Sequence, residues 1–409
     1  MDNLKMTEAE YIFGSHDEKT LTQLADVASR AEQVALMADG HLGYIMPIGG
    51  VAAYDNKVSV AGVGYDIACG NAAIKTNLYL EDIQSNLSTI ADQIARTIDF
   101  GVGRGNSNKD APSDDPLFKD DAWKVIPKKK GVRERLLNKA KSQIGSVGSG
   151  NHYVDIFADE NEQIWVGVHF GSRGFGHSIA STFMALAQGK SWEEKAPAAE
   201  TLLDLDTALG QAYWEMMQLA GKYAYVGREW VARKTVEILG ASELELVHNH
   251  HNFAWKEKHN GKEYIVVRKG ATPAFPGQKG FVGGSMGDNA VILRGKVDAK
   301  AKTLQKQENA LFSTVHGAGR VMSRTKAAGK RTWGKKSRLI KPGLISDQML
   351  YEWLQKQKVI LRGGGLDEAP QAYRRLPEVL ASQEDTIEVL HTLKPLIVVM
   401  EGRKKFNPA

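Results

Sequence analysis

Apolar residues recur at intervals of three and four in several stretches of the chain, which is the spacing of an amphipathic helix. Residues 15–38 are predicted to form one helix, because Ser15 and Glu18 match a capping box and Gly40 follows the periodic stretch. Further helices are predicted over residues 82–98 and 132–143, and a pair of helices is predicted over residues 197–239.

Short apolar runs between these stretches predict strands. The polar stretch 101–121, which is rich in Gly and Asp, predicts a long surface loop. Strands and helices do not alternate regularly, so the pattern does not favour a Rossmann fold or a barrel of alternating strands and helices. It predicts one large α+β domain over residues 1–409, with strands at 164–169, 244–248, 263–268, 290–294 and 395–400.

The composition is that of a globular protein, with 42% hydrophobic and 25% charged residues among 409. The net charge of +5 permits a polyanionic partner without indicating one. Cys69 is the single cysteine, so no disulfide can form within the chain, and the N-terminal residues lack the pattern of a signal peptide. The apolar stretch 393–400 is too short to cross a bilayer. We therefore expect a soluble cytoplasmic protein without membrane contact.

Five clusters of polar residues carry the candidate chemistry. In the first, Asp66 and Cys69 lie three residues apart in a turn flanked by Gly and can point at one ion. A carboxylate with a thiolate suits Mn, Zn or Fe better than Mg or Ca. Taken alone, this segment is better explained as a buried structural cysteine beside a turn aspartate.

The second cluster is the Gly/Ser run 145–150, which is followed by Asn151 and His152. Backbone N–H groups in such a run can hold a phosphate, and the two side chains add a hydrogen-bond donor and a metal ligand. A flexible turn with an incidental histidine explains this cluster equally well.

The third cluster begins where an apolar strand ends at His169. The following loop contains Arg173 and leads into a helix predicted to begin near Ser178. A strand end that opens toward a helix N-terminus commonly binds anions, and the guanidinium of Arg173 has the planar fork that phosphate favours. The alternative is a histidine whose hydrogen bonds are satisfied in the core.

The fourth cluster places three histidines within residues 248–251. In an extended strand His248 and His250 share one face and His251 takes the other, so alternation alone does not decide which of them is a ligand. A solvated surface patch is the alternative explanation.

The fifth cluster is His316, followed by three small residues and Arg320, with a helix predicted to extend through Ala328. The small residues allow a bulky group to approach an imidazole nucleophile, and Arg320 can offset the charge of that group. The alternative is a helix-starting turn that happens to contain a histidine.

Each cluster has a structural explanation on its own, but five such clusters in one chain are better explained by a common site. If Cys69 bridges two ions, a two-metal site of the kind used in phosphoryl chemistry can be assembled. Its ligands would be Asp66, Cys69, His152, His169 and one of the three central histidines.

In this order along the chain, the clusters resemble the RtcB family of tRNA-splicing and RNA-repair ligases. The resemblance covers nearly the whole chain, from VGYDIACG near residue 63 through GSGNHYVDI, VHFGSRGFG, HHNFA, RKGATPAFP, GGSMG and HGAGRVMSR to GGGLDEAPQAYRRL and LKPLIVVMEG. It implies a single RtcB-like α+β domain with a central site for two Mn²⁺ ions. Cys69 would bridge them, with Asp66 and His152 completing the protein ligands of one ion and His169 and His251 those of the other. His251 is chosen because the family's ligand directly precedes Asn-Phe.

The resemblance also implies a reaction. His316 would take a guanylate from GTP, release pyrophosphate, and pass the guanylate to an RNA 3′-phosphate, which the family can generate from a 2′,3′-cyclic phosphate. A 5′-hydroxyl would then attack the activated end and release GMP. Asn151 would position phosphate, and Arg173 would contact the terminal phosphate of the RNA. The RNA that is joined (tRNA or rRNA), the need for a helper such as archease, and the oligomeric state are left open.

The guanosine pocket implied by the resemblance departs from the family in several places. Asp155 stands where Glu is usual, Ala290 replaces a hydroxyl residue, Gly283 replaces a common Pro, and Glu401 stands where a Lys usually contacts the base. These departures predict weaker or less selective use of GTP and leave the reaction class unchanged. The expected pocket consists of Asn151, His152, Asp155, His251, Asn252, Gly283, Gly284, Ser285, Met286, Ala290, His316, Gly317, Ala318, Gly319 and Glu401.

Two other functions compete with ligation. A metal-dependent phosphohydrolase or cyclic phosphodiesterase that has lost ligation would keep the metal ligands, but hydrolysis does not need the intact turn 316–320. A non-catalytic RNA-binding module would not need the metal ligands, and the aromatic stacking platform expected of such a module is not evident in the sequence.

Overall fold

Buried apolar runs form two main β-sheets in the computed structural model, which describes residues 10–128, 131–332 and 338–408. The smaller sheet has the strand order β1 (Glu10–Ile12), β2 (Gln33–His41), β3 (Ile48–Tyr54), β11 (Lys262–Lys269), β10 (Asn252–His259). The larger has the order β13 (Lys279–Val282), β14 (Ala290–Gly295), β19 (Ile387–Met400), β6 (Tyr153–Ala158), β7 (Gln163–Phe170), β5 (Gly70–Tyr79), β9 (Glu243–His250), with β18 (Ile360–Arg362) and β20 (Lys405–Phe406) beside β19.

Three short strand pairs connect and flank these sheets. They are β4 (Lys57–Ser59) with β8 (Leu202–Asp204), β12 (Ala271–Pro273) with β15 (Ser313–Val315), and β16 (Lys330–Arg331) with β17 (Leu339–Lys341). Within the larger sheet the pairing along the main path is antiparallel, and β18 runs parallel to β19.

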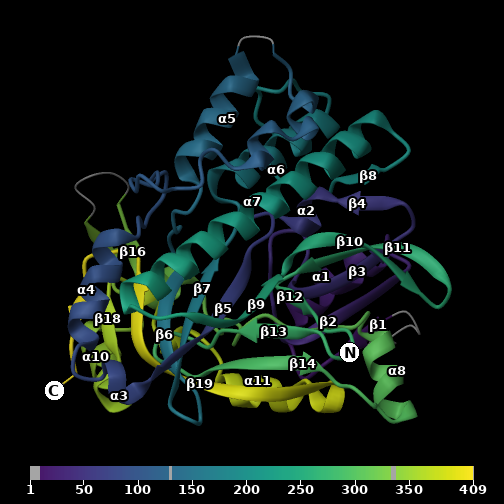
Figure 1. Ribbon diagram of the computed structural model, residues 1–409. Coiled ribbons are helices and arrows are strands. Elements are labelled where there is room, and N and C mark those ends of the chain that lie inside the picture. Colours follow the sequence, from purple (N-terminus) through teal and green to yellow (C-terminus); the bar gives the residue numbers. More distant parts are fainter. Residues whose placement is uncertain (1–9, 129–130, 333–337, 409) are drawn as a thin grey trace.

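Helices cover the sheets. The longest, α7, runs diagonally across the molecule in Figure 1, packs against β5 and β7, and has α5 and α6 above it in this view. Near the C-terminal end of the described chain, α4 and α10 lie close to β18 (Figure 1). The α-helices are α1 (Glu18–Ala28), α2 (Val60–Val63), α3 (Leu80–Ile83), α4 (Leu87–Thr97), α5 (Val132–Gln143), α6 (Arg173–Ala187), α7 (Ala208–Leu239), α8 (Ala301–Asn309), α9 (Arg324–Ala328), α10 (Asp347–Gln357) and α11 (Leu376–Ser382). Short 3₁₀ turns occupy 116–119, 121–125, 366–368, 370–372 and 384–386.

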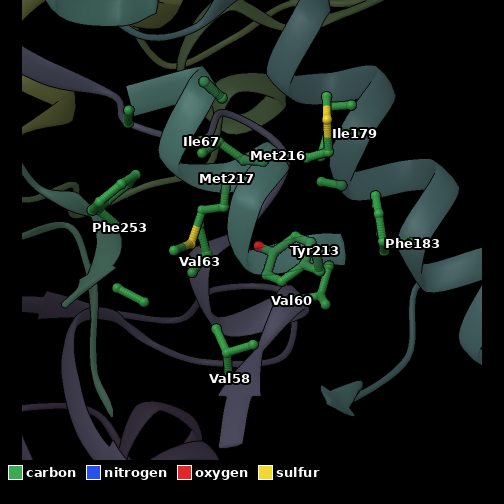
Figure 2. Close-up of a cluster of buried hydrophobic side chains, with 14 of the residues drawn as sticks. Val58, Val60, Val63, Ile67, Ile179, Phe183, Tyr213, Met216, Met217 and Phe253 are labelled. Carbon is green, nitrogen blue, oxygen red and sulfur yellow. The ribbon is translucent and has the colours of Figure 1, made fainter. Parts of the chain in front are cut away.

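Helix α7 is held at both ends and along one side. The Thr207 side chain accepts a hydrogen bond from the N–H of Gly210, and Gly240 ends the helix in the left-handed conformation that favours glycine. Figure 2 shows Tyr213, Met216 and Met217 of α7 in a cluster of buried side chains to which α6 and the segment 58–67 also contribute. This packing fixes α7 behind the strands that carry the candidate site.

The α+β fold predicted from the sequence is confirmed, as are the helix over 132–143 and the strands at the five apolar runs. The helix predicted over 15–38 is wrong beyond Ala28, because the apolar run 33–41 forms the buried strand β2. Asp17, not Ser15, caps α1, and Gly40 lies within β2. A continuous apolar run fits a strand covered on both faces as well as it fits a helix.

Other predicted boundaries also shift. The helical pair predicted over 197–239 is the single helix α7 preceded by the short strand β8. The helix predicted over 82–98 is split into α3 and α4, and the surface loop predicted over 101–121 gives way to 3₁₀ turns from Pro116 onward. Helix α6 begins at Arg173, five residues before the predicted start at Ser178. Among the described helices, none is long and apolar enough to cross a membrane.

Candidate active site

The ends of four neighbouring strands bring the candidate metal ligands together. In the larger sheet β6, β7, β5 and β9 lie side by side, Tyr153 pairs with His169, and Asn71 pairs with His169 and with Asn249. One end of the sheet therefore collects a residue from each strand: His152 directly before β6, His169 near the end of β7, Cys69 directly before β5, and His251 directly after β9.

These side chains form two groups that share Cys69. The Cys69 Sγ atom lies 3.2 Å from His169 Nε2 and 3.7 Å from His152 Nε2, and Asp66 Oδ2 lies 3.1 Å from His152 Nε2. One group is Cys69, His169 and His251 and the other is Asp66, Cys69 and His152, with the candidate ligand atoms of each group within 4.8 Å of one another. A thiol common to both groups is the arrangement that a bridging ligand requires.

Burial sets the protonation of this cluster. It lowers the pKa of His169 and of His251 well below the usual range, so both imidazoles are neutral at pH 7, as metal ligands must be. Burial and the neighbouring Asp66 carboxylate raise the pKa of the Cys69 thiol. For Asp66 itself burial opposes ionisation, but the hydrogen bond and the electrostatic interaction with His152 lower its pKa. A bound cation would favour the thiolate in place of the thiol.

The donor set fits the ions implied by the resemblance. One thiol, one carboxylate and three imidazoles suit a transition metal such as Mn²⁺ better than Mg²⁺ or Ca²⁺. In addition, Nδ1 of His251 and the hydroxyl of Tyr153 are buried without a hydrogen-bond partner in the described chain. Unpartnered buried polar atoms are costly, and ligand binding in the pocket gives a reason to keep them there.

His316 faces the cluster from the strand pair β12–β15. It directly follows β15, and the N–H of Ala271 in β12 donates to the carbonyl of His251 at 3.1 Å. The ring centres of His316 and His251 are 4.9 Å apart. The fold therefore places the candidate nucleophile beside one of the two ligand groups.

Asp39 of β2 holds His316 from the side. Its buried Oδ2 atom lies 2.6 Å from His316 Nδ1 and also accepts the N–H groups of His316 at 3.1 Å and Gly317 at 3.3 Å. A carboxylate at Nδ1 favours the tautomer protonated on that nitrogen, which leaves the Nε2 lone pair free to attack. Asp39 thus lies against Nδ1 of the candidate nucleophile, where a carboxylate can favour one tautomer of the imidazole.

A pocket of about 400 Å³ joins His316 and the candidate metal ligands. All the residues predicted for the guanosine pocket line it except Ala290, which is buried in β14, and Glu401. Asp155 is buried in this pocket, burial raises its pKa well above the usual range, and its Oδ1 atom has no partner in the described chain. The hydroxyl of Tyr153 is likewise buried and unpartnered. These atoms are available to a bound molecule.

Arg173 lies beside the pocket and does not line it. Its Nε donates to Ser146 Oγ at 3.2 Å and its Nη2 donates to the carbonyl of Gly101 at 2.8 Å. The Gly/Ser run contributes less backbone than its sequence suggests, because the N–H groups of Ser146 and Val147 already donate to backbone carbonyls. Of residues 145–152, only Asn151 and His152 line the pocket.

His248 and His250 belong to a different cluster, built around the buried Arg228. Arg228 Nε donates to His248 Nε2 at 2.9 Å, and Arg228 Nη2 lies 2.7 Å from His250 Nδ1. Arg228 Nη1 donates to the carbonyls of Ala68 and Phe170 at 2.8 and 2.6 Å. The expectation that His248 and His250 share one face and His251 the other is confirmed, and the pair is explained by Arg228 without any ion.

Sequence reasoning missed Asp39 and Arg228. The available signal for Asp39 was an acid within the apolar run 34–41, followed by His41, and the assignment of that run to a helix hid it. Arg228 lies in the middle of α7 and has no local motif around it. Only the packing of α7 behind β5 and β9 reveals its role.

Comparison with known proteins is consistent across the chain. Residues 20–401 match the family described as tRNA-splicing ligase RtcB. The chain is 32% identical over 391 residues to the RNA-splicing ligase RtcB of Escherichia coli strain K12, with 90% of each chain covered. It is 30% identical over 438 residues to the tRNA-splicing ligase RtcB of Nanoarchaeum equitans, covering 89% of this chain and 87% of that one.

Together with the clustered thiol, carboxylate and imidazoles, these matches define an RNA-processing ligase with candidate metal-binding residues at its centre. The chain belongs to the RtcB family. The resemblance noted in the sequence is thereby confirmed.

Proposed function

We propose that the chain joins RNA 3′-phosphate or 2′,3′-cyclic phosphate ends to 5′-hydroxyl ends, using GTP and a guanylated His316. The observation that carries the proposal is the pairing of His316 with Asp39 at 2.6 Å, directly beside the Cys69 cluster. Hydrolysis alone would need the cluster but would have no use for an oriented imidazole nucleophile.

In the first step Nε2 of His316 attacks the α-phosphorus of GTP. The N–P bond forms, the P–O bond to pyrophosphate breaks, and pyrophosphate leaves with the electron pair. Asp39 keeps the proton on Nδ1 and stabilises the positive charge that develops on the ring. Asn151 lines the pocket where it can donate a hydrogen bond to a phosphate oxygen. When bound, two Mn²⁺ ions held by Asp66, Cys69, His152, His169 and His251 would neutralise charge on the phosphate oxygens.

In the next steps the guanylate passes to the RNA. An oxygen of the 3′-phosphate, which a cyclic end gives by addition of water, attacks the guanylate phosphorus, so that the N–P bond breaks and neutral His316 is released. The 5′-hydroxyl, which gives up its proton to solvent, then attacks the activated 3′-phosphate, so that a phosphodiester forms and GMP leaves. Arg173 is proposed to contact the terminal phosphate, because its guanidinium lies beside Asp66 and His152 at the edge of the pocket. The partner RNA is proposed from the family, and any need for archease stays a prediction.

Guanine recognition is proposed for Asp155 and the loop 283–286, which line the same pocket as His316. The Asp155 carboxyl can accept from the N1–H and N2–H groups of guanine, and its Oδ1 atom has no other partner. Ala290 and Glu401 do not line this pocket, so their expected effect on GTP selectivity stays a prediction. Lys404 and Lys405, the two lysines that follow Glu401 most closely, bind Asp347 and Asp92.

Labelling with radioactive GTP in the presence of Mn²⁺ tests the proposal. Wild-type protein should acquire acid-labile label, and His316→Ala should acquire none while its metal content stays near normal. His391→Ala is the matched control, because His391 lies against Glu160 far along the sheet from the pocket and should label normally. Persistent labelling of His316→Ala would overturn the nucleophile. RNA-end hydrolysis without any labelled protein would instead favour the metal-dependent phosphohydrolase.

A further inference from the structure

A second hollow of about 680 Å³ opens beside the central pocket, and positive charge dominates its walls. It lies between the end of α4 with the following loop, the residues after β18, and the residues after β19. We call it the basic groove. Six of its lining residues are basic, Arg96, Arg104, Arg362, Arg403, Lys404 and Lys405, and three are acidic, Asp92, Asp99 and Glu401.

Three of these six basic residues form ion pairs with acidic residues of the fold. Arg362 is buried and donates to Asp92 at 2.8 Å, Lys405 also binds Asp92, and Lys404 binds Asp347. The other three, Arg96, Arg104 and Arg403, are exposed, and their side chains have no partner among the described residues. Three guanidinium groups without a partner in the described chain therefore face one hollow, against a single carboxylate without such a partner, Glu401.

The groove shares a wall with the pocket of the proposed RNA end site. Met400 lines both hollows. Gly101, in the groove wall, accepts a hydrogen bond from Arg173 Nη2 at 2.8 Å, and its N–H contacts the carbonyls of Val147 and Gly148. Gly148 in turn lies against the imidazole of His152. The wall of the groove thus binds Arg173 through Gly101 and continues to Gly148 beside His152, so a strand lying in the groove would run next to Arg173 and the candidate metal ligands.

Part of the groove lies beyond the family match, which ends at residue 401. The following residues form β20, which pairs with β18 so that Arg362 lies opposite Lys405, and Phe406 stacks on Tyr351 at 5.1 Å. This pairing fixes the segment 402–406 and holds Arg403 at the groove. The free charge of Arg403 therefore lies just beyond the matched region.

We propose that the basic groove binds the phosphodiester backbone of the RNA whose end is joined and directs that end to Arg173. The proposal rests on the proposed ligase function. Guanidinium groups suit phosphates, and free arginines spaced around a groove suit a repeating anion better than a single one. Phe100 is the sole aromatic residue in the described lining and is half-buried, which favours charge recognition over base stacking.

Binding of single-stranded RNA to the full-length protein tests the groove. The triple variant Arg96→Gln, Arg104→Gln, Arg403→Gln should bind a labelled oligonucleotide about tenfold to a hundredfold more weakly in 0.1 M salt. Its log–log salt slope should fall by about 2, since each phosphate contact on a single strand contributes about 0.7. Oligonucleotides with only a 3′-phosphate or only a 5′-hydroxyl end distinguish which strand lies in the groove. Weaker binding of the 3′-phosphate strand supports the proposal, and weaker binding of the 5′-hydroxyl strand alone would overturn it, because that strand has no terminal phosphate for Arg173.

Two matched controls sharpen the test. The triple variant Lys19→Gln, Lys258→Gln, Lys302→Gln removes the same charge from exposed positions on α1, β10 and α8, away from the groove (Figure 1), and should bind RNA as the wild type does. Glu401→Gln removes the one groove acid that has no partner in the described chain, so it should strengthen RNA binding severalfold. Equal loss in both triple variants would show non-specific attraction and overturn the proposal.

The remaining outcomes separate the groove from the reaction. GTP labelling of His316 should be normal in the groove triple variant, which also shows that the variant is folded. If the groove triple variant labels normally and binds RNA as tightly as the wild type, the proposal that the groove binds RNA is overturned and the ligase function is not. Groove-dependent RNA binding in a protein that never labels would overturn the ligase function and leave the groove in place. Tighter binding of a polyglutamate peptide than of RNA would assign the groove to an acidic protein partner and overturn the proposal.

Discussion

Two buried polar clusters meet at the turn that contains Ala68 and Cys69, and they differ in how their polar atoms are satisfied. Around Arg228, the guanidinium has partners on every nitrogen: two histidines and two backbone carbonyls. Around Cys69, by contrast, several buried polar atoms have no partner in the described chain. Examples are Nδ1 of His251, the hydroxyl of Tyr153 and Oδ1 of Asp155.

This difference distinguishes a cluster that supports the fold from a cluster that binds a ligand. A buried polar atom without a partner costs stability, so several such atoms in one pocket are most simply explained by a ligand that satisfies them. A fully bonded cluster needs no ligand. His250 and His251 illustrate the rule, because they are adjacent in sequence and yet His250 contacts Arg228 while His251 joins Cys69 and His169. Changes on the Cys69 side should therefore affect activity, and changes on the Arg228 side should affect stability.

The largest effect is expected for Cys69→Ala. Removing the shared thiol should release both metal ions and abolish ligation, while the free energy of unfolding of the metal-free protein changes by less than about 1 kcal/mol. Metal content measured by mass spectrometry and an RNA-joining assay check this. The control, His250→Ala, should keep both ions and lose about 1–3 kcal/mol of stability. Two retained ions in Cys69→Ala would show that the thiol is not a ligand.

Asp39→Asn comes next. Without the carboxylate, His316 loses its preferred tautomer, and the rate of guanylate transfer to protein should fall about a hundredfold to ten-thousandfold, with GTP affinity little changed. Rapid-mixing measurements of labelling at several GTP concentrations separate the rate from the affinity. Asp159→Asn is the matched control, a buried acid that binds Trp165 away from the pocket, and its labelling rate should be normal. An unchanged rate in Asp39→Asn would exclude Asp39 from positioning His316.

Arg228→Met tests the structural side of the comparison. Two carbonyls and two histidines would lose their donor, so the free energy of unfolding should fall by about 1–3 kcal/mol. Denaturant titration measures this change. Arg228→Lys keeps the charge but not the four contacts, so its free energy of unfolding should lie between those of Arg228→Met and the wild type. If Arg228→Met is as stable as the wild type, the cluster does not support the fold in the way described.

The smallest effect concerns Lys269, a buried lysine with one described partner, the carbonyl of Ala61 at 3.2 Å. Burial lowers its pKa from the ordinary 10.5 to about 8. Between these pH values the unfolded chain holds a proton that the folded chain has lost, so stability rises with pH there, and the full cost is present below pH 8. Lys269→Met should raise the free energy of unfolding by about 2 kcal/mol at pH 7, and the increase of stability with pH should become smaller. Denaturant titrations at pH 7 to 10 check it, and an unchanged slope would contradict it.

The sequence predicted the features that depend on short stretches of the chain, and it did not predict contacts between residues far apart along the chain. Continuous apolar runs located strands such as β7 and β11, and the clusters around Cys69, His152 and His316 were visible as motifs. Asp39 could not be paired with His316 from sequence, because 277 residues separate them and only the meeting of β2 with the turn after β15 joins them. Likewise, Glu401 was expected in the guanosine pocket from its motif, but the strand end directs it into the basic groove.

Strand β19 has a consequence for the order of folding. It is among the last elements of the chain, yet it lies inside the larger sheet, paired with β14, β6 and β18. During synthesis β6 and β14 must wait for it with unpaired edges, separated from their partner by at least about 90 residues of chain yet to be made. Nascent or truncated chains that lack β19 therefore expose the unpaired backbone N–H and C=O groups of two strand edges. Such edges promote aggregation and chaperone binding.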